Sequence, residues 1–327
     1  MAVPLATPKF SLRLSGVGKR YGDFVAVGDL SFEAPTGVVY GLLGPNGAGK
    51  TTTLRMINNI IMPDSGSIEL LGKLRPGPAA AKHIGYLPEE RGLYPKMKVR
   101  ETLAFFGSLR GLRGKEATRQ ADVWLERLKL SDWHGNNVQD LSKGMQQKVQ
   151  FAAALIHDPD LLILDEPWSG LDPINAEVLK DIVSAQKDAG KTILFSTHLM
   201  EQAEHLCDHV CIMAKGRKAV EGPLDELKRE AAAEGLIMLA FRTSEDEARA
   251  RTEVLVQPLV ESIRGERDGL LVQLAEGGDS DKLLAELVAA NLGIRRFERQ
   301  QATLHQIFVS RVGAMADAEQ EGRLADD

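Results

Sequence analysis

The 327-residue sequence has no long apolar run and only two cysteines. Its longest uninterrupted apolar runs, residues 151–156 and 236–241, fall far short of the roughly 20 residues that a membrane-spanning helix needs. We therefore expect no direct insertion into a membrane. Cys207 and Cys211 are too few for a disulfide framework, so we expect free thiols in a reducing compartment.

The sequence also lacks an excess of positive charge and the pattern of a secretory signal. Its 40 Lys and Arg are outnumbered by 46 Asp and Glu, and the net charge of −6 gives no general attraction to a phosphate backbone. We therefore expect no nucleic-acid partner. Residues 1–9 have neither a cationic start nor an apolar stretch, so we expect a cytoplasmic protein.

Short apolar runs bounded by turn residues predict a parallel sheet at the core of the chain. The predicted buried strands are residues 38–43, 161–164, 192–196 and 210–213. Helical patterns separate these runs, and strands that alternate with helices predict an α/β fold. Residues 10–14 and 30–32 are strand-like, with glycine-containing turns and no helix between them. We expect a small N-terminal antiparallel β layer there.

The chain is long enough for about two domains of roughly 150 residues each. Because the pattern changes at a helix start over residues 222–230, we expect a first domain over residues 10–230, after an N-terminal extension over residues 1–9. Residues 231–312 combine strand and helix patterns, which predicts a small C-terminal α+β module. The polar, mostly acidic tail over residues 313–327 is expected to be disordered.

One segment matches the phosphate-binding motif G-x-x-x-x-G-K-[ST] between a predicted strand and a predicted helix. The predicted nucleotide-binding residues are Gly44, Pro45, Asn46, Gly47, Ala48, Gly49, Lys50, Thr51 and Thr52. Glycines let the backbone wrap a pyrophosphate, with N–H groups directed at the negative charge. Lys50 would add a cation for the β- and γ-phosphates, and Thr51 a hydroxyl ligand for Mg²⁺. A plain glycine-rich turn is the alternative interpretation.

An apolar strand that ends in two acidic residues follows this loop along the chain. Asp165 closes the strand over residues 161–164, where a carboxylate beside the loop can hold Mg²⁺. Glu166 is suited to polarise an attacking water, which favours a hydrolase over a kinase. A solvated strand cap is the alternative for such a pair in isolation. Together with the phosphate-binding loop, the pair predicts hydrolysis of a nucleoside triphosphate.

The motifs, in this order, resemble the ATP-binding cassette (ABC) family over residues 10–221. Residues 141–147, Leu-Ser-Lys-Gly-Met-Gln-Gln, resemble the family's signature segment, and residues 169–172 resemble its D-loop. His198, directly after a predicted strand, resembles its switch histidine. The resemblance implies the fold of a P-loop NTPase ABC nucleotide-binding domain, with a parallel sheet core and a helical subdomain. It also implies ATP and Mg²⁺ as ligands.

The resemblance further implies that two cassettes work together. Four signature residues would contact ATP held by the other cassette of a homodimer or heterodimer: Ser142, Lys143, Gly144 and Met145. The family usually has glycine and glutamine where Lys143 and Met145 stand. Asp172 would link the two sites, and His198 would act with Glu166 in catalysis.

Two other segments are less regular matches to the family. Tyr21 matches the aromatic residue that stacks on adenine, with a plain strand tyrosine as the alternative. Glu89 stands where the family's Q-loop usually has glutamine, and its carboxylate can still ligate Mg²⁺. Leu93, Tyr94 and Met97 follow, and the resemblance implies that they contact a permease. Packing within their own domain is the alternative.

Residues 85–95 and 303–308 look like sodium-extrusion and antibiotic-resistance exporters that pair with ABC-2 type permeases. The resemblance therefore implies an ATP-hydrolysing subunit that drives a separate transmembrane permease by ATP-dependent dimer closure. Such a subunit exports ions or drugs and lies on the inner face of the cell membrane through its permease. A soluble ABC ATPase of translation or repair is the alternative. A silent nucleotide sensor is disfavoured because the catalytic residues are present.

His205, Cys207, His209 and Cys211 would line up as zinc ligands on one continuous strand. The pattern around them instead predicts a helix that ends near residue 207 and a strand from residue 210. We therefore expect no metal site in this segment.

Overall fold

The computed structural model describes residues 9–313 except 91, 233–234, 257, 267, 276 and 300–301. The N-terminal extension and the disordered tail expected from the sequence therefore lie almost wholly outside the described residues. The chain divides into two compact units that part between Gly222 and Pro223. The helix start at residues 222–230 thus opens the second unit.

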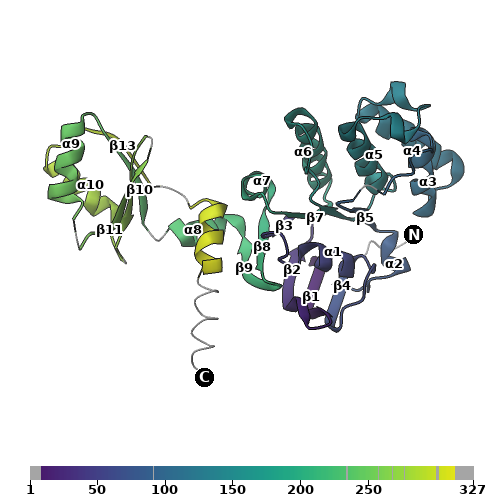
Figure 1. Ribbon diagram of the computed structural model, residues 1–327, viewed down its shortest axis with the longest axis horizontal. Helices are drawn as coiled ribbons and strands as arrows, with labels where there is room; N and C mark the ends of the chain where they lie inside the picture. The colour runs from purple at the N-terminus through teal and green to yellow at the C-terminus, as the bar shows by residue number, and fades with distance from the viewer. Residues whose placement is uncertain are drawn as a thin grey trace. The chain divides into compact units, whose positions relative to one another are not determined.

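The first unit contains the longer part of the chain (Figure 1). Its elements are β1 (Phe10–Tyr21), β2 (Phe24–Pro35), β3 (Val39–Leu43), α1 (Lys50–Ile57), β4 (Ser65–Leu70), α2 (Pro78–Ala81), β5 (Ile84–Leu87), α3 (Val99–Leu109), α4 (Gly114–Arg127), the 3₁₀ turns Ser131–Trp133 and Val138–Asp140, α5 (Lys143–Leu155), β6 (Leu161–Asp165), α6 (Pro173–Asp188), β7 (Thr192–Thr197), α7 (Met200–Leu206), β8 (His209–Ala214) and β9 (Arg217–Pro223).

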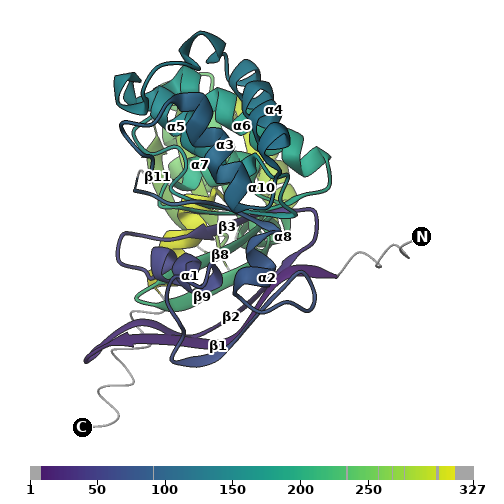
Figure 2. The ribbon, with the colours of Figure 1, turned by 90° about the vertical axis from the view of Figure 1, so that its right-hand side faces the viewer.

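Two sheets form the framework of this unit. The larger has strand order β5-β6-β7-β3-β8-β9, with parallel pairing from β5 through β8. The smaller is the antiparallel sheet β2-β1-β4. In Figures 1 and 2, α1 and the smaller sheet lie on one side of the larger sheet, and α3 to α6 lie on the other. The predicted α/β fold with an N-terminal antiparallel layer is confirmed.

The core of the first unit brings the two sheets and α1 into one apolar cluster. Leu14 and Leu30 of the smaller sheet join Leu42, Leu54 and Ile163 in this cluster, and all five are buried. Strands β3, β6 and β7 are buried along their whole length, as expected for a parallel sheet covered on both faces. The C-terminal ends of these strands carry the loops of the candidate site.

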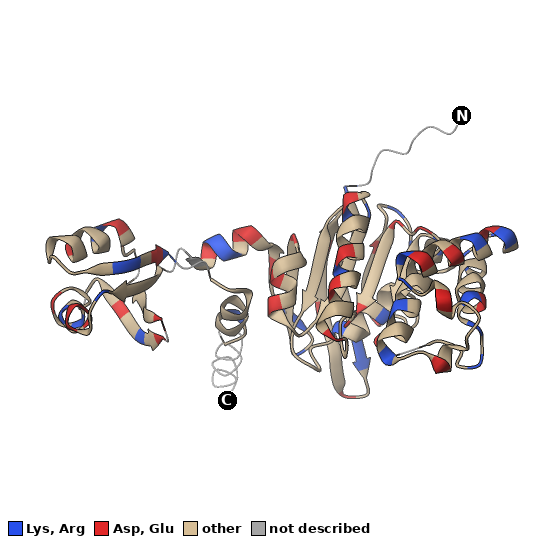
Figure 3. Ribbon diagram, turned by 90° about the horizontal axis from the view of Figure 1, so that it is seen from above, with Lys and Arg blue, Asp and Glu red and all other residues tan. Residues whose placement is uncertain are grey.

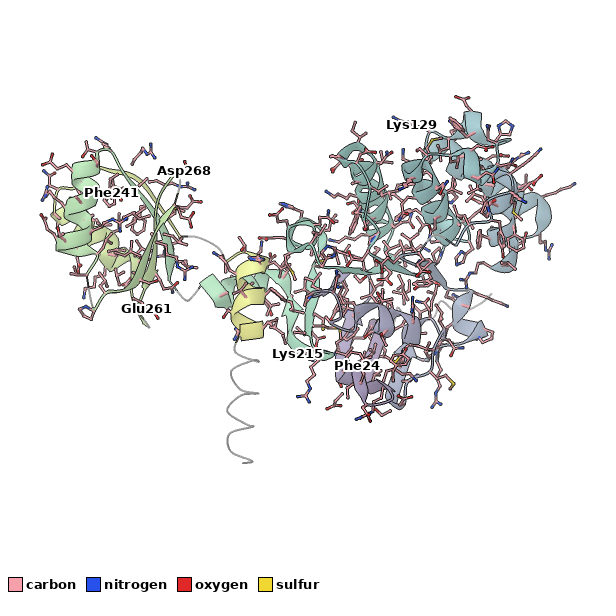
Figure 4. All side chains as sticks on the ribbon, in the orientation of Figure 1. Phe24, Lys129, Lys215, Phe241, Glu261 and Asp268 are labelled. Atoms are coloured by element: carbon pink, nitrogen blue, oxygen red, sulfur yellow. The ribbon has the colours of Figure 1, made fainter. Side chains whose placement is uncertain are left out.

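The second unit is a smaller α+β module, as the sequence predicts. Its elements are α8 (Leu224–Ala232), β10 (Leu236–Phe241), α9 (Ser244–Arg249), the π-helical segment Ala250–Val254, β11 (Val260–Glu266), β12 (Gly269–Leu274), α10 (Ser280–Ala289), β13 (Ile294–Arg299) and a helix over residues 304–313. Its antiparallel sheet has the order β11-β12-β10-β13. Ile237, Val272 and Leu283 belong to its separate core, as does Phe241 (Figure 4).

Charged residues lie mostly on the outer surfaces of both units. Figure 3 shows basic and acidic segments interspersed along the helices rather than gathered into one field. No helix of the described residues is long and apolar enough to cross a membrane.

Candidate functional site

The phosphate-binding loop joins β3 to α1, and its glycines are required by close backbone contacts. A Cβ atom on Gly44 would lie 2.2 Å from the Met213 carbonyl oxygen. Gly49 has a φ of 98°, and a Cβ there would lie 2.5 Å from the Ala26 carbonyl oxygen. No residue with a side chain fits at either position without moving β2 or β8. The loop can therefore wind tightly enough to direct its N–H groups at one anion.

Lys50 is the first residue of α1, and its ammonium group is hydrogen-bonded to the loop. Its Nζ donates hydrogen bonds to the Gly44 carbonyl oxygen at 2.7 Å and to the Pro45 carbonyl oxygen at 3.2 Å. The Glu166 Oε1 atom is 3.6 Å from Nζ. Burial lowers the pKa of Lys50, and the neighbouring carboxylates of Glu166 and Asp165 oppose that shift. The buried ammonium is thus a cation held beside the loop.

Asp165 ends β6 directly beside the start of α1. Its Oδ1 accepts hydrogen bonds from Ser196 Oγ at 2.5 Å and from Thr51 Oγ1 at 3.3 Å. Its Oδ2 is buried and has no hydrogen-bond partner among the described residues. Burial raises the pKa of this carboxyl group, while the bonds from Ser196 and Thr51 lower it.

The free Asp165 oxygen and the Thr51 hydroxyl fit a Mg²⁺ ion. Magnesium prefers oxygen ligands and is usually held by one or two carboxylates together with substrate phosphates and water. A buried carboxylate oxygen without a partner is costly unless such a ligand satisfies it. The donor set at this position therefore suits the ion.

Glu166 has an unusual backbone and a well-fixed side chain. Its φ is 46°, in the left-handed region that side-chain-bearing residues seldom occupy. Its N–H donates to the Ser196 carbonyl oxygen and to Ser196 Oγ, each at 3.2 Å. Its Oε1 lies 3.0 Å from His198 Nδ1. Glu166 is 9% exposed and lines a pocket at the phosphate-binding loop.

These groups open into a pocket of about 480 Å³, which is large enough for a nucleotide. It is lined by Phe24, Ala26, Asn46, Gly47, Ala48, Gly49, Lys50, Thr51, Thr52, Glu89, Glu166, Ser169 and His198. Most of the residues predicted for one cassette therefore lie together. Phe24 and Ala26 are lining residues that no sequence motif marked, and Ser169 is the first residue of the segment that resembles the D-loop.

Tyr21 does not line the pocket, but its neighbour in the hairpin does. Tyr21 pairs with Phe24 across the turn between β1 and β2. Both side chains are exposed, Tyr21 by 52% and Phe24 by 64%, and Lys19 Nζ lies 5.8 Å from the centre of the Tyr21 ring. Figure 4 labels Phe24 on the side of the first unit that holds the smaller sheet. The aromatic residue at the pocket edge is therefore Phe24.

Glu89 lines the pocket from the segment after β5, and α5 fixes that segment. The buried Gln150 of α5 donates from Nε2 to the Pro88 and Glu90 carbonyl oxygens, each at 3.1 Å. Gln147, one turn earlier, donates to the Pro167 carbonyl oxygen at 3.2 Å. One helix therefore holds both the Glu89 segment and the segment after Glu166.

The signature residues and Asp172 of the D-loop lie outside the pocket. Ser142 caps α5 by accepting a hydrogen bond from the Met145 N–H at 3.3 Å. Asp172 caps α6 by accepting from the Asn175 N–H at 2.9 Å. A Cβ atom on Gly144 would lie 3.0 Å from Asn175 Nδ2, so the two caps are neighbours. Ser142, Lys143, Gly144, Met145 and Asp172 do not line the pocket of their own chain.

Comparisons with known proteins agree with this architecture. A family model described as "ABC transporter" matches residues 27–169, and one described as "ATP-binding protein DrrA1-3-like, C-terminal domain" matches residues 222–312. The chain is 43% identical over 307 residues to the uncharacterized ABC transporter ATP-binding protein YhaQ of Bacillus subtilis, covering 93% of this chain and 99% of that protein. It is 44% identical over 218 residues to the Nod factor export ATP-binding protein I of Cupriavidus metallidurans, covering 66% and 72%.

A solved structure of the ATP-binding subunit of an ABC transporter superposes with a TM-score of 0.63. It is 32% identical in sequence, and the match covers 69% of this chain and 95% of that one. Together with the near full-length relative and the geometry of the pocket, this likeness settles the family. The chain belongs to the ATP-binding subunits of ABC transporters and is an ATPase.

Proposed function

We propose that the chain is the ATP-hydrolysing subunit of an exporter and that it drives a separate membrane permease. The observation that carries the proposal is the pocket at the phosphate-binding loop, which the buried Lys50 and the Glu166–His198 pair line. Asp165, with its free oxygen, is hydrogen-bonded to the lining residue Thr51. The similarity to a Nod factor export ATP-binding protein supports export. An ion, drug or antibiotic is the class of cargo that we expect.

In this proposal, the N–H groups of residues 46–50 bind the β- and γ-phosphates. Lys50 leaves the two loop carbonyls that it now contacts and turns its ammonium group to the phosphates. Thr51 and Asp165 hold Mg²⁺, with Glu89 as a further oxygen donor at the pocket edge. When bound, the ion offsets the negative charge that the phosphates bring into the site.

Glu166 acts as the base in the proposed reaction. It accepts a proton from the water that attacks the γ-phosphate, because its carboxylate lines the pocket 3.6 Å from the Lys50 ammonium group. His198 fixes the direction of that carboxylate through its contact at Oε1. Water activation thus falls to one acid held by one histidine.

We further propose a dimer of cassettes, either identical or different, as the working state. Ser142, Gly144 and Asp172 lie at helix caps outside their own pocket. The N-terminus of α5 offers N–H groups that can bind an anion. In the proposed dimer, that anion is the γ-phosphate of the ATP that the second cassette holds. Each ATP would then be enclosed by the loop of one chain and the signature of the other.

The permease is proposed to dock on the helical subdomain, which consists of the packed helices α3, α4 and α5 and the segment before them. This contact would bring the subunit to the inner face of the membrane. Tyr94 is 50% exposed and lies 5.6 Å from the Phe105 ring and 6.3 Å from the Phe106 ring, measured between centroids. A pocket of about 220 Å³ beside it is lined in part by Leu93 and Phe106. An exposed aromatic group next to an apolar pocket suits a protein partner.

The dimer can be tested by light scattering of the full chain. Glu166→Gln with ATP and Mg²⁺ is expected to double in mass, because ATP binds but is not consumed. Glu166→Gln combined with Ser142→Arg is expected to bind ATP and stay monomeric, since the added side chain blocks the signature surface. A monomer in both cases, with ATP bound, would contradict a dimer of identical cassettes.

A further inference from the structure

Ser196 contacts both acids of the site through one hydroxyl group. It lies near the end of β7, is fully buried and pairs in register with Asp165 of β6. Its Oγ donates to Asp165 Oδ1 at 2.5 Å and accepts from the Glu166 N–H at 3.2 Å. The sequence analysis gave this residue no role.

On the Asp165 side, this hydrogen bond fixes the orientation of the carboxylate plane. Oδ1 accepts from Ser196 and more weakly from Thr51, while Oδ2 has no partner among the described residues. A carboxylate turns easily about its last side-chain bond. The short bond to Ser196 restrains that rotation, so that the oxygen without a partner keeps one direction.

On the Glu166 side, β7 holds the residue at two points. The Glu166 backbone has a φ of 46°, which needs support from its surroundings. Its N–H is shared between the carbonyl oxygen and the hydroxyl of Ser196. His198, two residues further along the chain, contacts the Glu166 carboxylate at 3.0 Å. Ser196 therefore orients the backbone, and His198 orients the side chain.

We infer that Ser196 is a positioning residue that aligns Asp165 for Mg²⁺ and Glu166 for the attacking water. The inference rests on the roles proposed above for the two acids. It assigns Ser196 no contact with ATP, so the hydroxyl acts only through its two neighbours. Loss of a residue that hydrogen-bonds to a metal ligand commonly lowers the affinity for the metal by about 10- to 100-fold.

Thr192 provides a matched control at the other end of the same strand. It is also fully buried, its Oγ1 lies 2.7 Å from Ser11 Oγ, and it accepts from the Gly37 N–H at 2.8 Å. None of these partners belongs to the candidate site. Thr192→Val removes a buried hydroxyl from β7 without touching either acid, so it reports the purely structural cost of such a loss.

The test is a Mg²⁺ titration of the full chain with a fluorescent ATP analogue, read as nucleotide binding rather than as turnover. Ser196→Ala is expected to raise the half-saturating Mg²⁺ concentration by about 10-fold and to lower kcat. Ser196→Thr is expected to restore both values to within about 3-fold of wild type. Thr192→Val is expected to lower the melting temperature while its Mg²⁺ titration stays at the wild-type position. If Ser196→Ala does not fold, Ser196→Cys, a weaker donor of similar shape, is expected to shift the titration in the same direction.

Asp165→Asn separates the two ways in which the inference can fail. If Asp165→Asn abolishes the Mg²⁺ dependence while Ser196→Ala, or Ser196→Cys in its place, titrates like wild type, the role of Ser196 is refuted and the proposed Mg²⁺ site stands. If Asp165→Asn leaves the Mg²⁺ dependence unchanged, the proposed Mg²⁺ site fails and the inference fails with it. A shift in Thr192→Val equal to that of Ser196→Ala would also refute the specific role of Ser196.

Discussion

At the scale of single residues, the site is a small group of buried charges that balance one another before any nucleotide arrives. Lys50 lies between two loop carbonyl oxygens and Glu166, and Asp165 lies between two hydroxyl groups. Burial acts in opposite directions on the cation and on the acid, since it disfavours the charged form of each. A nucleotide with its Mg²⁺ would give each group a new partner of opposite charge.

Lys50→Ala removes the cation of the loop, so nucleotide binding is expected to weaken by about 10- to 100-fold, as for the loss of a charged hydrogen bond. A titration with a fluorescent ATP analogue measures this change. Lys180→Ala is the control, because that lysine is half-buried, pairs with Glu177 on α6 and does not line the pocket. Equal affinities for Lys50→Ala and wild type would contradict the role proposed for the loop lysine.

Phe24 and Tyr21 are the two candidates for the residue that stacks on adenine. Because Phe24 lines the pocket and Tyr21 does not, Phe24→Ala is expected to weaken binding of the ATP analogue by about 5-fold or more, the typical contribution of base stacking. Tyr21→Ala is expected to have the smaller effect. A loss seen only in Tyr21→Ala would favour the residue predicted from the family resemblance.

At the scale of elements, α5 connects three predicted parts of the site. It begins at Ser142, and its buried amides Gln147 and Gln150 hold the segments that follow β6 and β5. The helix ends near His157, whose Nε2 lies 3.1 Å from the Ile84 carbonyl oxygen. Burial lowers the pKa of His157 to about 4, and the nearby Arg110 acts in the same direction.

This pKa predicts that acid weakens the first unit. The unfolded chain binds a proton at His157 near pH 6.5, whereas the folded chain binds it only near pH 4. The free energy of unfolding should therefore fall between pH 6.5 and pH 4, by less than about 3 kcal/mol. Urea unfolding at pH 7 and pH 5 measures the slope. His157→Gln should flatten it, and the exposed His134→Gln should not; equal slopes in all three proteins would contradict the prediction.

At the scale of the whole molecule, the cassette and the C-terminal module have separate cores. The P-loop and the acidic pair were predictable because each motif consists of a few adjacent residues. The order of the motifs can be read directly along the chain. Phe24 was not, because its place at the pocket depends on the β1–β2 pairing, whose register shifts several times. Ser196 depends in the same way on its register with Asp165. Strand β11 has little sequence signal, because most of its side chains are polar and exposed.

The proposed link to a permease predicts a defect that appears only in the assembled transporter. Tyr94→Ala should leave ATP turnover of the purified chain unchanged and lower transport in vesicles, because Tyr94 lies outside the nucleotide pocket. Val123→Ala, which alters another exposed residue of the helical subdomain, is the control. Unchanged transport by Tyr94→Ala would remove this residue from the docking surface.

The central claim is that Glu166 activates water at a site that binds ATP without its help. Steady-state ATP turnover by Glu166→Gln, measured beside the affinity for an ATP analogue, tests it most directly. The account predicts that turnover falls by about 10²- to 10⁴-fold while the affinity stays close to wild type. Near-normal turnover, or a loss of nucleotide binding that accounts for the whole defect, would contradict it.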